Sequence, residues 1–259
     1  MKVLSANIAH GLRFGEFSTV EESALKLLAL ELDADIVCLQ EVDFKKQRSS
    51  FLDQIEVLKT CGSFMTGRFF PALVGEPGVR SAFRMPTMSE IDTPPADSYG
   101  IGILSRYPII NVETIQLSAS QFSLPMPFMI DGSTRWRMIP DEPRILVRIT
   151  LNSPLGEVDV VTTHLSFIPT RAITQLRTSR HLEKGRPWIL AGDLNLAPGV
   201  TSRISGLHHA VLAPTYPKLK PRAQLDHILL SKELQCINAG VKELSISDHL
   251  AVFAEVARK

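Results

Sequence analysis

Isolated carboxylate, carboxamide and imidazole side chains stand at the ends of short apolar runs in this chain, where they could perform acid–base chemistry. In the stretch 188–195, WILAGDLN, an apolar run leads through Gly192 to Asp193 and Asn195. At the two-residue period of a strand, these last two side chains point the same way and could hold a water molecule. Gly192 lacks a side chain and would let another group approach the backbone closely. Taken alone, the stretch is more typical of an Asp/Asn turn after a core strand.

The same design recurs along the chain, which favours one shared site over unrelated turns. The polar positions are Asn7, Glu41, His164, Asp193 with Asn195, Asp226, and Asp248 with His249. Carboxylates that converge repel one another, and a divalent cation removes that conflict. Asp, Glu and Asn oxygens are hard ligands, so we expect Mg²⁺ or Mn²⁺ rather than zinc. Histidines beside them could orient a group, act as an acid, or face a developing negative charge.

Buried strands are expected to position these side chains, because the apolar runs are short and bounded by turn residues. We predict strands at 2–8, 35–41, 64–74, 99–105, 109–117, 144–151, 157–163, 188–195 and 224–231, and a last one after His249. Helices are predicted from the capping-box pattern Ser18-Thr19-Val20-Glu21 to about Leu32, from near Ser50 to Lys59, and over 171–183. Segments 75–98, 118–143 and 197–224 are expected to be irregular loops.

Many strands and few helices predict an α/β fold of two packed sheets with helices outside, in one domain over residues 1–259. The chain has 259 residues and is 44% apolar, which is enough for a substantial core. Its formal net charge of +1 gives no overall attraction to nucleic acid or to an anionic membrane.

The three cysteines are far apart in the sequence and lack zinc-site spacing, which indicates free thiols in a reducing compartment. No apolar run is long enough to cross a membrane, and Met1-Lys2 leads directly into a strand-like run rather than a secretory signal. These features predict a cytoplasmic location. The sequence does not indicate an oligomeric state.

Six short motifs resemble, in their order, those of the endonuclease/exonuclease/phosphatase superfamily, which has the fold of pancreatic deoxyribonuclease. They are Ser-Ala-Asn7-Ile, Gln40-Glu41, Thr163-His164-Leu165, Gly192-Asp193-Leu194-Asn195, Leu225-Asp226-His227-Ile228 and Ser247-Asp248-His249. The resemblance is to a bacterial-type member and spans nearly the whole chain. It implies a four-layer α/β sandwich, with two mostly antiparallel sheets flanked by helices and the site at one edge. It also implies metal-dependent hydrolysis of a phosphate ester.

The resemblance assigns metal binding to Glu41 as the principal ligand, with Asn7 and Asp248 as direct or water-mediated ligands. Asp193 resembles the group that orients and deprotonates the attacking water. Asn195 resembles the group that hydrogen-bonds this water or the phosphate.

His249, supported by Asp226, resembles the histidine that stabilises the pentacovalent transition state. His164 resembles the second histidine of the deoxyribonuclease and sphingomyelinase branches. Arg48 and Arg144 match positions common in bacterial members, where they would line the cleft and bind substrate; ordinary exposed arginines are the alternative.

The resemblance leaves the substrate open, because the superfamily includes nucleases, lipid phosphodiesterases and inositol-phosphate phosphatases. A phosphodiesterase is the preferred prediction, and the alternatives are a soluble phosphomonoesterase and a non-catalytic binding protein that retains the fold. Thr163-His164-Leu165 and the near-neutral charge argue against abasic-site repair. His227 is interpreted as a packed strand residue, and surface positions are expected for the remaining histidines: His10, His181, His208 and His209.

Overall fold

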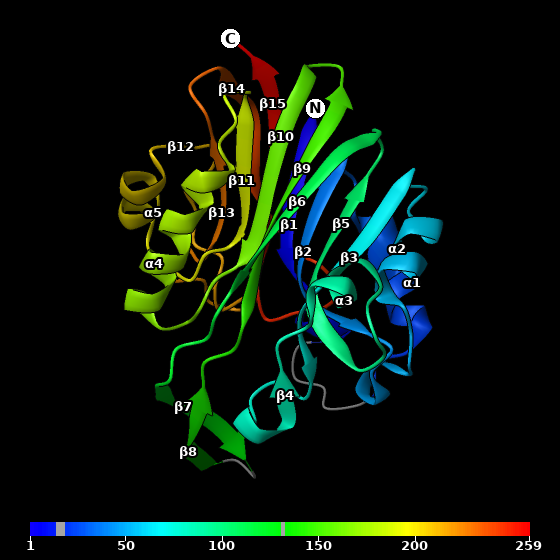
Figure 1. The fold of residues 1–259 in the computed structure, drawn as a ribbon, viewed down its shortest axis with the longest axis vertical. Coiled ribbons are helices and arrows are strands. Elements are labelled where there is room, and N and C mark those ends of the chain that lie inside the picture. Colours follow the sequence, from blue (N-terminus) through cyan, green and yellow to red (C-terminus); the bar gives the residue numbers. More distant parts are fainter. Residues whose placement is uncertain (14–18, 131–132) are drawn as a thin grey trace.

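The computed structural model describes residues 1–13, 19–130 and 133–259. Two β-sheets lie face to face with helices on their outer sides, which is the predicted four-layer α/β sandwich (Figure 1). Both sheets are mixed but mostly antiparallel, and the parallel pairs among the described strands are β1–β2 and β10–β11.

The first sheet has the strand order β14-β15-β1-β2-β5-β3-β4. Its strands are Leu234–Lys242, Ala251–Arg258, Lys2–Asn7, Ile36–Phe44, Ser98–Ser105, Thr66–Gly75 and Phe83–Arg84, respectively. The second sheet has the order β12-β13-β11-β10-β9-β6. Its strands are His208–His209, Asp226–Leu230, Trp188–Asp193, Gly156–His164, Arg144–Ser153 and Ile109–Leu117.

Apolar residues on both faces of the central strands bind the four layers together. Val3 points into the core between the sheets, while its neighbour Leu4 faces the helices outside the first sheet. Val160 and Val161 divide in the same way between the central core and the helices outside the second sheet. A strand buried on both faces reads as a continuous apolar run, which explains why these strands were predictable from sequence.

Helices α1 (Glu22–Glu31) and α2 (Gln54–Cys61) cover the first sheet, and α4 (Pro169–Thr178) and α5 (Pro198–Ser205) cover the second (Figure 1). A short helix, α3, spans Met88–Asp92, and single 3-10 turns lie at Ala9–Gly11, Gln47–Ser49, Arg80–Ala82 and Ser179–Leu182. The predicted capping box includes Ser18, which lies outside the described residues; Glu21 occupies the N-cap of α1 without a side-chain capping bond.

Two segments predicted as irregular are ordered instead. Segment 118–143 contains an antiparallel ribbon of β7 (Ser123–Ile130) and β8 (Ser133–Pro140), which form a two-stranded sheet of their own. Prolines such as Pro125 are compatible with this ribbon because each of its strands has an edge without a partner. Segment 75–98 likewise contains β4, α3 and a 3-10 turn.

The sequence prediction also missed α5 and β14. Helix α5 lies in the segment predicted as a loop, although Pro198 in its first turn and Gly206 at its end are helix boundary signals. The three cysteines are free thiols and form no disulfide with one another. Among the described helices, none has the length and apolar character needed to cross a lipid bilayer.

Candidate active site

Strand register brings the predicted polar residues to one edge of the sandwich. Asn7 at the end of β1 lies opposite Gln40 of the parallel strand β2. In the second sheet, His164 pairs in register with Asp193, and Asp193 with Asp226 at the start of β13. Because β1 and β2 run parallel, as do β10 and β11, the carboxyl ends of each pair meet at the same edge.

A β-bulge directs Glu41 into the site. The register of β2 with β5 shifts between Gln40 and Val42, so Glu41 is the extra residue of the bulge. Its φ angle is 57°, an uncommon backbone conformation for a residue with a side chain. Bulges of this kind redirect one side chain out of the strand's alternation and occur often beside active sites.

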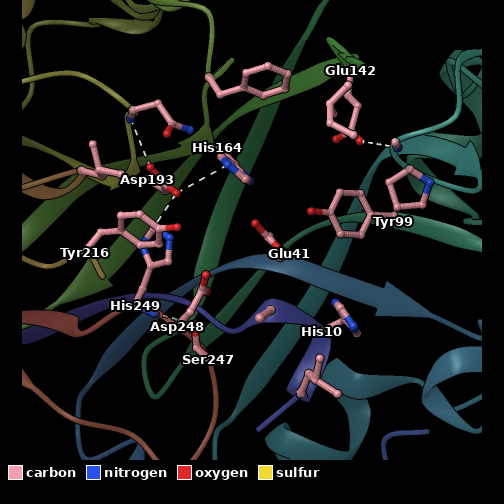
Figure 2. Close-up of a pocket in the computed structure, with 18 of the residues that line it drawn as sticks. His10, Glu41, Tyr99, Glu142, His164, Asp193, Tyr216, Ser247, Asp248 and His249 are labelled. Carbon is pink, nitrogen blue, oxygen red and sulfur yellow. Dashed lines mark hydrogen bonds and ion pairs between the residues drawn. The ribbon is translucent and has the colours of Figure 1, made fainter. Parts of the chain in front are cut away.

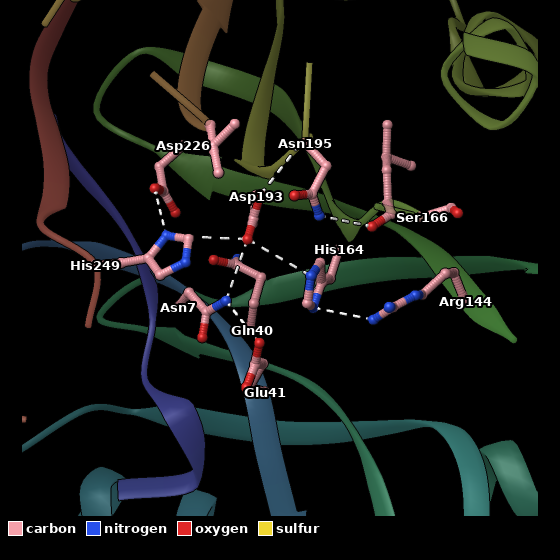
Figure 3. A network of polar contacts seen from close by, with 12 residues as sticks. Asn7, Gln40, Glu41, Arg144, His164, Ser166, Asp193, Asn195, Asp226 and His249 are labelled. Atoms are coloured by element: carbon pink, nitrogen blue, oxygen red, sulfur yellow. Dashed lines mark hydrogen bonds and ion pairs between the residues drawn. The ribbon is translucent and has the colours of Figure 1, made fainter. Parts of the chain in front are cut away.

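The Asp193 carboxylate is the centre of the polar network (Figure 3). Its Oδ2 accepts a hydrogen bond from Asn7 Nδ2 at 3.1 Å, and its Oδ1 accepts one from the Asn195 amide at 3.1 Å. The same Asn7 Nδ2 donates to Glu41 Oε1 at 2.9 Å. Burial raises the pKa of Asp193, and the negative charge of Asp226 raises it further. A buried carboxylate with a raised pKa is a stronger base near neutral pH than an exposed one.

Gly192, directly before Asp193, lets another strand approach the backbone closely, as the sequence suggested. A Cβ at this position would lie 2.0 Å from the carbonyl oxygen of Thr163 on β10. The predicted two-residue alternation of Asp193 and Asn195 is wrong, because β11 ends at Asp193 and Asn195 has a φ of 50°. Both side chains nevertheless line one cavity, since the Asp193 carboxylate and the Asn195 amide close a tight turn.

His249 lies beside two carboxylates. Its Nδ1 contacts Asp226 Oδ2 at 2.8 Å and lies 4.0 Å from Asp193 Oδ2. Burial alone would lower the pKa of His249, but the charge of Asp226, the hydrogen bond to it, and the charges of Asp193 and Asp248 raise it to about 10. His249 is therefore an imidazolium at neutral pH, and its ring packs 4.7 Å from that of Tyr216.

His164 approaches Asp193 from the other side but has the opposite charge state. Its Nε2 lies 3.5 Å from Asp193 Oδ2, and its Nδ1 lies 3.1 Å from Nη1 of Arg144. Burial lowers the pKa of His164 well below its ordinary value, and the positive charges of Arg144 and His249 lower it further. His164 is therefore neutral.

These residues line a cavity of about 760 Å³ (Figure 2). All the predicted site residues except Asn7 and Asp226 are in its lining, and those two lie directly behind it in contact with Asp193 and His249, respectively. The lining also contains residues that the sequence analysis did not select, including His10, Tyr99, Glu142, Phe167 and Tyr216. None of these stands in a recognisable motif, and only the fold brings them to the cavity.

Arg48 and Arg144 both line the cavity, but each is held by an acidic residue. Arg48 donates two hydrogen bonds of 2.8 Å to buried Asp43. Arg144 is only 4% exposed and lies 3.4 Å from Glu142. The second arginine is thus not an exposed surface residue.

The other histidines divide between structural and surface positions. His227 is fully buried, with Nε2 2.9 Å from the Leu196 carbonyl oxygen, which fits its interpretation as a packed residue. The predicted surface positions of His10 and His209 are wrong. His10 is partly buried in the cavity wall, where burial and Arg48 lower its pKa to about 4, and His209 contacts the Pro198 carbonyl oxygen at 2.9 Å. His181 and His208 are exposed as predicted.

Comparison with known proteins identifies the family. The model of the Endonuclease/Exonuclease/phosphatase family matches residues 4–249, nearly the whole chain. The chain belongs to this family. Its members are hydrolases of phosphate esters. No curated protein sequence matches the chain.

Solved structures share the fold over the full length of the chain. An endonuclease/exonuclease/phosphatase from Beutenbergia cavernae DSM 12333 superposes with a TM-score of 0.71 at 19% identity, covering 100% of this chain and 71% of that one. The human Nocturnin catalytic domain with bound sulfate anion has a TM-score of 0.62 at 21% identity, covering 100% and 94%. A mannosyl-6-phosphatase from Bacteroides thetaiotaomicron VPI-5482 has a TM-score of 0.58 at 17% identity, covering 99% of both chains.

Proposed function

We propose that this chain is a divalent-metal-dependent phosphodiesterase in which Asp193 activates the attacking water. The observation that carries the proposal is the position of Asp193 between a charged and a neutral histidine at the wall of an open cavity. A base removes a proton from the attacking water, and a fixed positive charge beside it stabilises the negative charge that develops on the phosphate, so this arrangement suits water attack on a phosphorus centre.

The donor set of the cavity fits a hard cation such as Mg²⁺ or Mn²⁺. Glu41 and Asp248 both face the cavity (Figure 2). Asn7 Nδ2 donates to Glu41 Oε1 at 2.9 Å, so these two proposed ligands lie side by side. We assign the metal to Glu41, Asn7 and Asp248. When bound, the ion would neutralise phosphate charge and polarise the phosphorus–oxygen bond.

A second cluster, Asp193, Asp226 and His249, also has ligand atoms within 4.8 Å of one another. We propose that this cluster holds a proton on His249 Nδ1 instead of a metal ion, because Asp226 accepts a hydrogen bond from that nitrogen at 2.8 Å. A metal ligand must give up the proton that this hydrogen bond uses.

The remaining steps follow from the protonation states. Deprotonated Asp193 takes a proton from the attacking water, and Asn7 and the Asn195 amide hold its carboxylate in place. His249 keeps Nδ1–H on Asp226, so its Nε2–H is free to donate to a phosphate oxygen as negative charge develops there. Asn195 lies beside Asp193 on the cavity wall, where it would orient the water or the phosphate.

The extent of the cavity favours a diester over a monoester. Besides its polar residues, the lining includes Tyr216, Leu225, Val79, Ile139 and Phe167. A diester has an organic group on each side of the phosphorus, and this partly apolar lining offers surface for such groups. The mannosyl-6-phosphatase among the structural neighbours is named for a monoester substrate, so the fold alone does not decide between the two classes.

A substrate panel tests the proposal. The panel contains bis-p-nitrophenyl phosphate, p-nitrophenyl phosphate, single- and double-stranded DNA, RNA, sphingomyelin and inositol phosphates, each with Mg²⁺, Mn²⁺ or EDTA. We expect diester hydrolysis that needs the metal and is abolished by EDTA. Full activity in metal-free buffer would contradict the metal assignment, and hydrolysis of monoesters alone would contradict the diester assignment.

A further inference from the structure

A line of buried polar side chains leads from Glu142, in the cavity lining, through Arg144 and His164 to Asp193 (Figures 2 and 3). Glu142 Oε1 accepts from the Gly78 amide at 2.8 Å, and Glu142 Oε2 lies 3.4 Å from Arg144 Nη2. Arg144 Nη1 then lies 3.1 Å from His164 Nδ1, and His164 Nε2 lies 3.5 Å from Asp193 Oδ2. Glu142, Arg144 and His164 are each no more than 7% exposed.

The chemistry of a guanidinium fixes the direction of these contacts. An arginine side chain carries only N–H donors and remains charged in proteins. His164 Nδ1 must therefore accept from Arg144, because two donors facing each other across 3.1 Å would repel. With Nδ1 used as an acceptor, the one proton of the neutral ring is on Nε2, which faces Asp193.

We propose that Arg144 is a positioning residue that keeps His164 neutral, with its proton on Nε2 directed at the catalytic Asp193. This assignment rests on the proposed function of Asp193, and it replaces the substrate-binding role that the family resemblance implied for Arg144. Both terminal nitrogens of Arg144 have protein partners, His164 and Glu142, which supports positioning over direct phosphate binding.

The charges around His164 explain why a cation is needed at this position. Arg144 faces the ring from β9, Asp193 faces it from β11, and His249 approaches from the segment before β15. Without Arg144, Asp193 would draw a second proton onto the ring. A charged His164 would form an ion pair with Asp193 and weaken it as a base.

Three variants of the full-length protein test the proposal: Arg144→Met, Arg144→Lys and Arg148→Met. Arg148 is a matched control, since it lies four residues later on β9, is also 4% exposed, and is held by Asp159 at 3.0 Å and by Glu113. Long-range proton–nitrogen NMR of the metal-free protein reports the protonation state of the His164 ring between pH 5 and pH 8. Steady-state kinetics with bis-p-nitrophenyl phosphate and Mg²⁺ separates kcat from KM.

In the wild type and Arg148→Met, we expect His164 to remain a neutral ring with its proton on Nε2. In Arg144→Met, Nδ1 should become protonated within this pH range, kcat at pH 7 should fall about 10- to 100-fold with little change in KM, and the acid limb of the pH–rate profile should move to higher pH. Arg144→Lys, which keeps one donor and the charge, should recover part of kcat.

The proposal is overturned if His164 keeps the wild-type nitrogen signals in Arg144→Met. It is also overturned if Arg144→Met raises KM and leaves kcat unchanged, which would return Arg144 to substrate binding. If the Met variant does not fold, Arg144→Gln, which also removes the charge, replaces it in the same measurement. If the wild type hydrolyses no ester with either metal, the proposed function fails, while the spectra still decide the role of Arg144.

Discussion

His249 and His164 flank the same oxygen of Asp193, at 4.0 Å and 3.5 Å, yet they differ in charge. Both are buried, which favours the neutral form of each. His249 contacts Asp226, whose negative charge overcomes burial and holds the ring protonated. His164 contacts Arg144, whose positive charge adds to burial and holds the ring neutral.

This difference shows that the residue behind each histidine decides what the histidine can do. The charged ring can donate to a phosphate oxygen, and the neutral ring can orient the base without neutralising it. Two carboxylate-backed histidines around Asp193 would both be cations, and the carboxylate between them would be a weak base. Asymmetry between the two partners is therefore part of the proposed mechanism.

The largest loss of activity is expected from the substitution that removes the carboxylate contacted by both histidines. Asp193→Asn keeps the side-chain shape but removes the proposed base, so kcat should fall about 10²- to 10⁴-fold. The melting temperature should change little or rise, because one of several crowded carboxylates becomes neutral. The measurements are kcat against Mg²⁺ concentration and thermal unfolding. Near-normal kcat, or a loss that added metal reverses, would refute the role of Asp193.

The next largest effect is expected from a substitution that makes the charge states of the two histidines more alike. Asp226→Asn removes the negative charge behind His249, so the pKa of His249 should fall toward its ordinary value. We expect a roughly 10- to 100-fold loss of kcat at pH 7, growing as pH rises because the ring loses its proton earlier. A pH–rate profile of both proteins measures this. A loss of equal size at every pH would mean that Asp226 contributes structure and not charge.

A smaller effect is expected from a substitution at the proposed metal ligand Glu41, which tests the metal site separately from the two histidines. Glu41→Gln should weaken Mg²⁺ binding by at least about tenfold and leave kcat partly restored at high Mg²⁺. Calorimetric titration with Mg²⁺ and kinetics at several metal concentrations measure the two quantities. Unchanged metal affinity in Glu41→Gln, combined with lost affinity in Asp226→Asn, would move the ion to the Asp193, Asp226 and His249 cluster.

The last prediction concerns stability rather than activity, and it extends the comparison to His227, a histidine outside the cavity lining. Burial lowers the pKa of His227 to about 4, and in the unfolded chain it is near 6.5. The unfolded state therefore binds the proton more readily, and the free energy of unfolding should fall as pH drops from 6.5 to 4, by up to about 3 kcal/mol from this residue.

Urea unfolding across that pH range measures the effect. His227→Gln should show a shallower fall than the wild type, because its side chain does not titrate. Exposed His181 offers the control, and His181→Gln should keep the wild-type pH dependence. Parallel curves for wild type and His227→Gln would show that His227 is not a neutral buried ring.

Much of the fold was predictable because its central strands are buried on both faces and read as apolar runs, as in Ile36–Leu39. Elements without that signal were missed. Strand β14 is half exposed and mixes polar with apolar residues, and the ribbon of β7 and β8 carries prolines that argue against strands. In both cases, pairing with a neighbouring strand decided the structure over local sequence.

The candidate site was predictable where a motif ends a strand, as for Asp193 and His164. Contacts between distant motifs needed the structure. No spacing in the sequence indicates that Arg144 meets His164, that Glu142 secures Arg144, or that a bulge turns Glu41 toward the cavity. These depend on how two strands lie side by side, which a single sequence does not specify.

The ribbon of β7 and β8 pairs within itself and forms a sheet separate from the two that carry the candidate site residues, while Arg137 and Ile139 of β8 reach the cavity wall. Because β7 and β8 pair with each other and not with the two large sheets, changes in the length or sequence of this ribbon need not alter the strand registers around Asp193. Evolution can thus vary this part of the cavity wall separately from the candidate active site. Descendants of one ancestral hydrolase could acquire new substrates by rewriting this hairpin, with no loss of the inherited chemistry along the way.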